Sequence, residues 1–212
     1  MEQATPTVFV VDDDDAARTG LCALAASISL KVEAFASAQE FLDAYPPDAV
    51  GCLLLDVRMP GMSGLKLQEE LNRRGAGLPI IFITGHGDVS MAVEALRKGA
   101  FDFMEKPIRG QLLLERIQCA IETHQRLRRR EASMRQTQAR RALLTERELE
   151  ILDCVQQGRG AKSIAQEFGL SRKTVDAHMT SIRGKMEVES TPQLVMLLYE
   201  SGLLQPSFAE SL

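Results

Sequence analysis

Two apolar runs within the first 56 residues of the chain end on carboxylates. The run VFVV leads directly into Asp12 and Asp13, and the run LLL leads into Asp56. One such residue could simply be a solvated strand end, but carboxylates that converge cost free energy unless a cation or a proton compensates them. If the fold brings these three side chains together, Mg²⁺, which prefers oxygen ligands, is the natural compensating ion.

Two further polar residues follow short strand-like segments later in the sequence. Thr84 follows PIIFI and Lys106 follows FDFME, which adds a hydroxyl and a mobile ammonium to the set. A metal and an ammonium can neutralise phosphate oxygens while a carboxylate attacks phosphorus, so these residue types together suit phosphoryl transfer.

The elements that must position these residues alternate between strands and helices. Strands are predicted over residues 7–11, 31–35, 50–55, 79–83 and 101–104, and helices over residues 16–29, 38–44, 65–74, 89–98 and from 112 onward. This alternation predicts an α/β fold, a doubly wound five-stranded parallel sheet with helices on both faces. No G-x-G-x-x-G follows the first strand, so a dinucleotide site is disfavoured. The strand order 2-1-3-4-5 would put strands 1 and 3 side by side, with their polar ends at one rim.

The segments VVDDDDAAR, LLLDVRMPGMSG, FITGHGD and GAFDFMEKP resemble, in order, the receiver domain of two-component response regulators. The resemblance covers residues 7 to about 122, within a domain predicted over residues 1–122. It implies that Asp56 is the phosphoacceptor and that Asp12, Asp13, Asp56 and the backbone carbonyl of Arg58 hold Mg²⁺. It also implies that Arg58 and His86, two residues after Asp56 and Thr84, tune the lifetime of the phosphoryl group.

The same resemblance assigns roles at the ends of the last two strands. It implies that Thr84 follows the phosphoryl group as a switch and that Lys106 binds it. Phe103 occupies the position of the switch aromatic of the family, although a plain core phenylalanine explains it equally well. The Lys106–Pro107 peptide is expected to be cis.

Charge is distributed unevenly along the 212 residues. Residues 1–124 contain 18 acidic and 11 basic side chains, whereas residues 125–212 contain 11 and 14, for a net charge of −4 at pH 7. An acidic front half and a basic back half predict two domains with different partners. The basic excess is small, so charge alone is weak support for nucleic-acid binding.

Residues 123–141 are predicted to form a helical linker between the two domains. Leu113, Ala120, Leu127 and Met134 recur at seven-residue spacing, which suits a rigid continuation of the preceding helix. The high charge of the same segment is equally compatible with a flexible, solvated linker.

Residues 142–212 predict an all-α helix-turn-helix domain. A capping box, TERE, begins the first helix at residues 145–148, and Ser171 is expected to cap a longer helix over residues 172–186. Thr191 is expected to cap a final helix with Pro192 at its first position.

The segment LTERELEILDCVQQGRGAKSIAQEFGLSRKTVDAHMTSIRGKM resembles the LuxR-type DNA-binding domain of the FixJ and NarL groups, over about residues 142–203. The resemblance implies that Asp176, Ala177 and Thr180 face base edges. Many members of the family have Lys where this chain has Asp176, and a carboxylate could accept a hydrogen bond from cytosine N4 or merely be exposed. The other expected DNA contacts, mostly to phosphates, are Ser171, Arg172, Lys173, Thr174, His178, Arg183 and Lys185.

These resemblances together predict a transcription regulator controlled by phosphorylation. A sensor histidine kinase would phosphorylate Asp56, an otherwise monomeric receiver would dimerise, and the paired helix-turn-helix domains would bind double-stranded promoter DNA. A regulator that works without phosphorylation is an alternative. An aspartyl-phosphate phosphatase of the haloacid type is disfavoured, because that chemistry wants a second Asp where this chain has Arg58. No enzymatic activity is therefore expected.

The remaining sequence features favour a cytoplasmic protein without a membrane partner. No apolar stretch is long enough to span a bilayer, and the N-terminus MEQATPT lacks the features of a secretory signal. The four cysteines form no C-x-x-C pair and predict reduced thiols rather than a metal site: Cys22, Cys52, Cys119 and Cys154.

Overall fold

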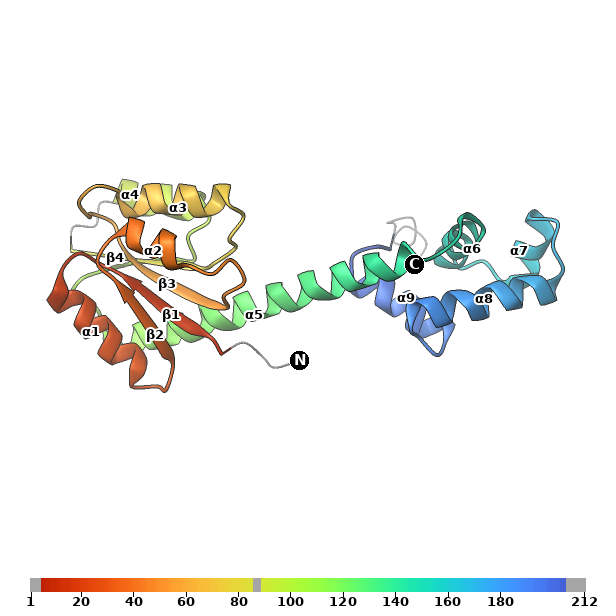
Figure 1. Cartoon of the computed structure of the whole chain (residues 1–212), viewed down its shortest axis with the longest axis horizontal. Coiled ribbons are helices and arrows are strands. Elements are labelled where there is room, and N and C mark those ends of the chain that lie inside the picture. The colour runs from red at the N-terminus through yellow and green to blue at the C-terminus, as the bar shows by residue number, and fades with distance from the viewer. Residues whose placement is uncertain (1–4, 86–88, 205–212) are drawn as a thin grey trace. The chain divides into compact units, whose positions relative to one another are not determined.

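The computed structural model describes residues 5–85 and 89–204 (Figure 1). The chain divides into two compact units, Met1–Arg128 and Arg129–Leu212, and each is considered by itself.

The first unit contains a five-stranded parallel sheet in the predicted order, β2-β1-β3-β4-β5. All five strands begin and end within one residue of the predicted bounds, because apolar or alternating runs between turn residues mark them clearly. The strands are β1 (Thr7–Val11), β2 (Lys31–Phe35), β3 (Gly51–Asp56), β4 (Ile80–Thr84) and β5 (Asp102–Glu105).

Four helices and the first part of a fifth, α5, belong to the described residues of the same unit, and Figure 1 shows helices on both faces of the sheet. Alternate residues of each strand point to opposite faces, so the buried residues form two separate clusters. Phe9, Leu53 and Phe82 contribute to one cluster, whereas Val10 and Leu54 contribute to the other. The helices are α1 (Asp15–Ala26), α2 (Ala38–Ala44), α3 (Gly64–Arg73), α4 (Val89–Arg97) and α5 (Gly110–Arg141).

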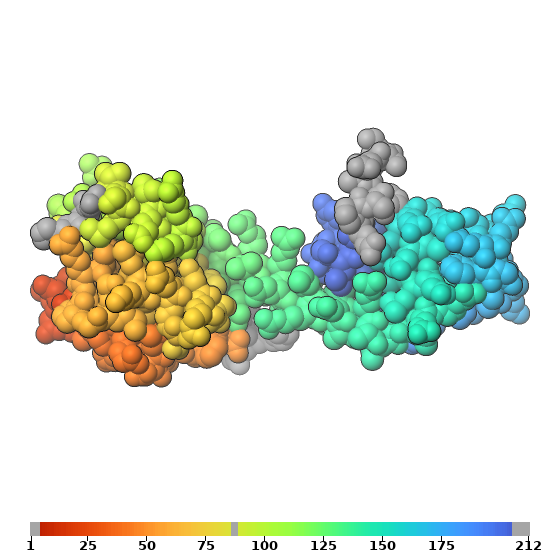
Figure 2. Space-filling model, turned by 90° about the horizontal axis from the view of Figure 1, so that it is seen from above, coloured from red at the N-terminus to blue at the C-terminus, as the bar shows by residue number. Residues whose placement is uncertain are grey.

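Helices α3 and α4 lie side by side, and Figure 2 shows them as adjacent yellow and yellow-green surfaces. Two amide side chains of α3 bind backbone carbonyls at the end of α4. Gln68 Nε2 donates to Ala95 O at 2.9 Å, and Asn72 Nδ2 donates to Lys98 O at 2.8 Å. The last turn of α4 is therefore fixed to α3 by hydrogen bonds as well as by packing.

Helix α5 is held to the beginning of β3 by a buried histidine. His124 Nδ1 lies 3.0 Å from Gly51 O and 3.2 Å from Gly51 N. The helix then continues to Arg141, so residues 123–141, predicted as a helical linker, are helical.

The second unit contains four helices after the end of α5, namely α6 (Glu146–Gln156), α7 (Ala161–Glu167), α8 (Arg172–Met186) and α9 (Thr191–Glu200). The capping box at Thr145 and the cap of α8 at Ser171 are formed as predicted. The predicted cap of α9 is wrong by one residue. Ser190 has an extended backbone and accepts from Gln193 N, whereas Thr191 is already helical, so Pro192 occupies the second helical position.

Candidate phosphoacceptor site and DNA-binding helix

The carboxyl ends of β1 and β3 bring two of the three predicted carboxylates together. Asp12 directly follows β1 and is 1% exposed, and Asp56 ends β3 and is 8% exposed. The ammonium of Lys106 bridges them, with Nζ at 2.9 Å from Asp12 Oδ2 and 3.5 Å from Asp56 Oδ1. Asp13, the third predicted carboxylate, is exposed beside this pair.

The parallel register explains why residues far apart in sequence converge here. Val11 pairs with Leu55, so the residues that follow β1 and complete β3 lie at the same edge of the sheet. Thr84 ends β4 at this edge and is buried. Lys106 N donates to Thr84 O at 2.8 Å, and the Lys106–Pro107 peptide is cis, as predicted.

The loop that carries Asp12 is fixed by contacts that the sequence did not reveal. Asp14 N donates to Asp12 Oδ1 at 3.0 Å, and Arg18 Nη1 donates to the Asp12 carbonyl at 2.7 Å. Arg18 also pairs with Asp15, so one guanidinium closes the turn. Asp14 caps α1 by accepting from Ala17 N, and its position before a helical pattern was a signal for this cap.

The pKa values of Asp56 and Lys106 are both raised, but for different reasons. Burial raises the pKa of Asp56, and the Asp12 charge raises it further, against the backbone hydrogen bond from Arg58 and the charge of Lys106. For Lys106, burial lowers the pKa, but the hydrogen bond and ion pair with Asp12, together with Asp56, outweigh burial and leave it raised. The carboxylate at position 56 is therefore incompletely compensated, whereas the ammonium is firmly charged.

This charge imbalance suits a cation. Asp12 and Asp56 present two carboxylates to a single ammonium, which leaves negative charge and free oxygen lone pairs at the rim. Within residues 5–85 and 89–204, no three His, Cys, Asp or Glu side chains are gathered closely enough to form a complete metal site. The protein side chains would thus provide only part of a coordination shell, as is usual for Mg²⁺, which keeps several waters.

Two residues predicted to modulate the site differ in what the structure shows. The backbone N–H of Arg58 donates to Asp56 Oδ2 at 2.7 Å, while its side chain is exposed. His86 lies outside the described residues. The Arg58 backbone therefore helps to orient the carboxylate.

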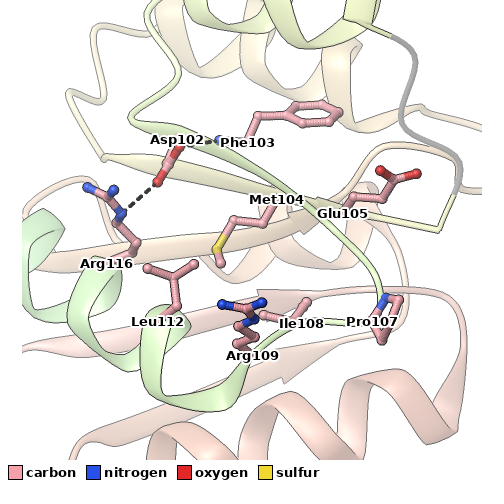
Figure 3. Close-up of a pocket in the computed structure, with 9 residues that line it drawn as sticks. All are labelled: Asp102, Phe103, Met104, Glu105, Pro107, Ile108, Arg109, Leu112 and Arg116. Carbon is pink, nitrogen blue, oxygen red and sulfur yellow. Dashed lines mark hydrogen bonds and ion pairs between the residues drawn. The ribbon is translucent and has the colours of Figure 1, made fainter.

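Phe103 lies on β5, where it lines a pocket of about 350 Å³ (Figure 3). Its ring is partly buried, with its centroid 6.1 Å from that of Phe82 in the sheet core. Across the same pocket, Arg116 Nε pairs with Asp102 Oδ2 at 3.1 Å. Phe103 thus packs against the sheet core and also lines the pocket, and its role as the switch aromatic stays a prediction.

In the second unit, α8 presents a polar face. Its inner stripe is buried, and Asp176, Ala177 and Thr180 are exposed on its outer side. Thr180 Oγ1 donates to the Asp176 carbonyl at 3.0 Å, and Arg183 Nη2 donates to Thr180 Oγ1 at 3.2 Å. The other predicted contact residues are exposed or half-buried, namely Ser171, Arg172, Lys173, Thr174, His178, Arg183 and Lys185.

Lys185 differs from the other cations of α8. Its Nζ lies 2.6 Å from Oε2 of Glu148, a residue of α6 that is only 4% exposed. The sequence identified Glu148 as part of a capping box but gave no sign that it also binds α8, because the contact joins residues far apart in the chain.

Two further properties concern the whole described chain. All four cysteines are free, as predicted. Among the described helices, none combines the length and apolar character needed to cross a bilayer.

Comparison with known proteins matches both units to families. Residues 8–118 match the family model of the response regulator receiver domain. Residues 142–198 match that of the bacterial regulatory proteins of the luxR family. The two matches occur in the order and at the positions of the two units.

Relatives of known function cover most of the chain. The transcriptional regulatory protein TdiR of Thauera aromatica is 44% identical over 189 residues, which is 89% of this chain and 83% of the relative. The transcriptional regulatory protein FixJ of Azorhizobium caulinodans is 40% identical over 203 residues, which is 96% of each.

Solved structures give the same result. The response regulator StyR superposes with a TM-score of 0.83 at 42% identity, covering 93% of this chain and all of that one. Full-length FixJ from B. japonicum superposes with a TM-score of 0.59 at 36% identity, covering 96% of this chain and all of that one.

Proposed function

Because the chain belongs to the response regulators that join a receiver domain to a LuxR-type DNA-binding domain, we propose that it regulates transcription through phosphorylation of Asp56. The observation that carries this proposal is the Lys106 bridge between Asp12 and Asp56 at the carboxyl edge of the sheet. The phosphoryl donor is a phosphohistidine of a sensor histidine kinase.

In the transfer step, an Asp56 carboxylate oxygen attacks the phosphorus of the donor. The new P–O bond forms as the P–N bond to the donor imidazole breaks, and the imidazole leaves with the electron pair of that bond. The backbone N–H of Arg58 holds the attacking carboxylate in place. Lys106, 2.9 Å from Asp12, supplies positive charge where the phosphoryl oxygens must lie.

A divalent cation fits the acidic edge of the site. Asp12, Asp13, Asp56 and the backbone carbonyl of Arg58 would hold Mg²⁺, which when bound neutralises phosphoryl oxygens. The turn that carries Asp12 and Asp13 is closed by Arg18, so the chain presents these carboxylates on a fixed backbone. Protein and ion together would balance the charge that Lys106 alone leaves unbalanced.

The phosphoryl group changes charge next to Thr84 and thereby acts on the rest of the receiver. The Thr84 hydroxyl moves toward the phosphoryl oxygens, and Phe103, on the neighbouring strand, follows. This shift changes the surface of α4 and β5 and favours a receiver homodimer. Two DNA-binding domains are then paired on a two-fold promoter site.

The exposed side of α8 enters the major groove of double-stranded DNA. Asp176, Ala177 and Thr180 face base edges, because they share the outer side of the helix. The residues that contact the backbone are Ser171, Arg172, Lys173, Thr174, His178 and Arg183. The protein has no enzymatic activity of its own. It acts in the cytoplasm, where the promoter DNA and the kinase domain of the sensor histidine kinase are accessible.

Phosphorylation and DNA binding can be tested on the full chain with a small-molecule phosphoryl donor and Mg²⁺. Incorporation of one phosphoryl group is expected in the wild type and in Asp43→Asn, an exposed control, but not in Asp56→Asn. Sedimentation should show a dimer only with the donor, and DNA affinity should rise in parallel. Equal DNA affinity and equal mass with and without the donor would instead favour the phosphorylation-independent regulator.

A further inference from the structure

One carboxylate in the DNA-binding unit, that of Glu148, accepts hydrogen bonds from three residues on two segments. Lys185 Nζ and Ser181 Oγ, both on α8, donate to Glu148 Oε2 and Oε1 at 2.6 Å each. Thr145 donates to Oε2 from its backbone N at 2.8 Å and from its hydroxyl at 3.0 Å. We refer to Thr145, Glu148, Ser181 and Lys185 as the Glu148 cluster.

The Glu148 cluster is more than a helix cap. A capping box requires only the reciprocal bonds between Thr145 and Glu148. Here Oε1 of Glu148 also accepts from Ser181, and Oε2 also accepts from Lys185, a residue four positions further along α8. Two donors one turn apart fix both the rotation of α8 about its axis and its position along that axis relative to α6.

The cluster also decides what Lys185 can do. Its carboxylate partner has a side chain only 5% exposed, and the Lys185 side chain is 32% exposed. If the ammonium swung out to a DNA phosphate, it would leave Glu148 ionised and buried without its cation, which is strongly unfavourable. Arg172, by comparison, is 78% exposed and lies 4.0 Å from its nearest acid, so it is available for a phosphate.

We propose that Lys185 is a positioning residue, which together with Glu148 and Ser181 orients α8 for base recognition and does not contact DNA. The proposal uses the proposed function only in taking α8 as the helix that reads DNA. It reverses the role that the family resemblance gives to Lys185, because an ammonium held at 2.6 Å by a buried carboxylate is not free to move out to a phosphate.

The dependence of DNA affinity on salt separates the two roles. Each phosphate contact contributes about 0.9 to the slope of log affinity against log salt concentration. The test compares the full-length wild type, Lys173→Gln and the double variant Glu148→Gln/Lys185→Gln. The double variant removes the ion pair without changing the net charge, so long-range electrostatics stay constant.

The probes are a labelled duplex that the wild type selects from a random library and an unrelated duplex of the same length. We expect Lys173→Gln to reduce the salt slope by about 1 and to keep the preference for the selected duplex. We expect the double variant to keep the slope and to lose about tenfold of the preference. A double variant with a slope reduced by about 1 and an intact preference would overturn the proposal.

A measurement without DNA tests the same assignment independently of the proposed function. Thermal unfolding of the two single variants and the double variant forms a double-mutant cycle. We expect the double variant to lose less stability than the two single variants lose together, because each single variant leaves one partner of the buried pair without the other. Additive effects would overturn the proposal even if no duplex is bound, and Ser181→Ala provides a milder variant should Lys185→Gln alone fail to fold.

Discussion

Replacing Asp56 by Asn is expected to stabilise the receiver unit at neutral pH when no divalent cation is present. Asp56 is nearly buried, and its closest donors are the Arg58 backbone at 2.7 Å and Lys106 at 3.5 Å. Lys106 lies closer to Asp12, at 2.9 Å, so Asp56 has the weaker share of that ammonium. Burial and the Asp12 charge raise the pKa of Asp56, which means that folding disfavours its ionised form.

The size of the effect follows from the geometry. One ammonium reaches both carboxylates, so their charges lie roughly 6 Å apart and repel by about 3 kcal/mol at an effective dielectric constant of about 20. Lys106 offsets most of this repulsion, while burial of the carboxylate adds to it. An Asn side chain keeps an oxygen for the Arg58 N–H, so we expect a net gain of about 1 kcal/mol in the free energy of unfolding.

The pH dependence has a definite sign. The pKa of Asp56 in the folded chain lies above its ordinary value of 3.8, so the folded state binds more protons than the unfolded state between these two values. The wild type therefore loses stability relative to Asp56→Asn as the pH rises through the folded pKa. The advantage of the variant is complete above that pKa and disappears below 3.8.

Hydrogen exchange during a urea titration of the full chain measures this stability for β1 and β3 separately from the second unit. Asp13→Asn is the matched control, since its side chain is exposed and its effect should stay within about 0.5 kcal/mol. A variant at position 56 that is less stable than the wild type at pH 7, or a difference that does not change with pH, would refute the reasoning.

Other substitutions test the packing of the receiver, each by urea unfolding of the full chain. Gly51→Ala should lower the free energy of unfolding by about 3 kcal/mol or more, because a Cβ there would lie 1.8 Å from Thr7 O. Gly20→Ala should raise it by about 0.5–1 kcal/mol, because a Cβ in the middle of α1 meets open space there. Gln68→Leu should be close to neutral, since it removes a hydrogen bond to Ala95 O but also a buried amide oxygen that finds no partner in the described chain. Gln68→Glu should cost about 3 kcal/mol or more, because it loses the donor and buries a charge; similar stabilities for the two would contradict this account.

The fold was predictable because its signals are local and repeated. Apolar runs such as the one before Asp56 mark buried strands, and helical spacing marks the elements between them. Once the alternation implied a parallel sheet, the rule that strand ends share one edge brought Asp12, Asp56, Thr84 and Lys106 together. That inference required no knowledge of side-chain directions.

The contacts missed by sequence reasoning depend on side-chain directions. Nothing in the sequence gave Arg18 a role, yet its guanidinium folds back onto the Asp12 carbonyl. Lys185 looked like its neighbours on α8, yet it turns toward Glu148. Helical periodicity separates buried from exposed faces, but it cannot tell which exposed cation finds an acid from another element.

Asp56 and Glu148, two of the buried carboxylates among the described residues, show how the number of hydrogen-bond donors decides between a reactive and a structural carboxylate. Burial raises the pKa of Glu148 as it does that of Asp56, but Lys185, Ser181 and Thr145 outweigh it and lower the pKa to about 2. Asp56 has too few donors to be lowered and keeps a reactive, poorly compensated charge, which a cation or a phosphoryl group can relieve.

This contrast makes the two units respond oppositely to acid. Glu148 contributes stability that is complete above its ordinary pKa of 4.5 and is lost as the pH falls toward about 2. In Glu148→Gln, the free energy of unfolding of the second unit should therefore depend less on pH over this range. Asp56→Asn should instead lose its advantage over the wild type in the receiver unit as the pH falls. Hydrogen exchange on one set of samples measures both stabilities as a function of pH. If the difference in the free energy of unfolding between wild type and variant had the same sign for both carboxylates, the number of donors would not govern their behaviour.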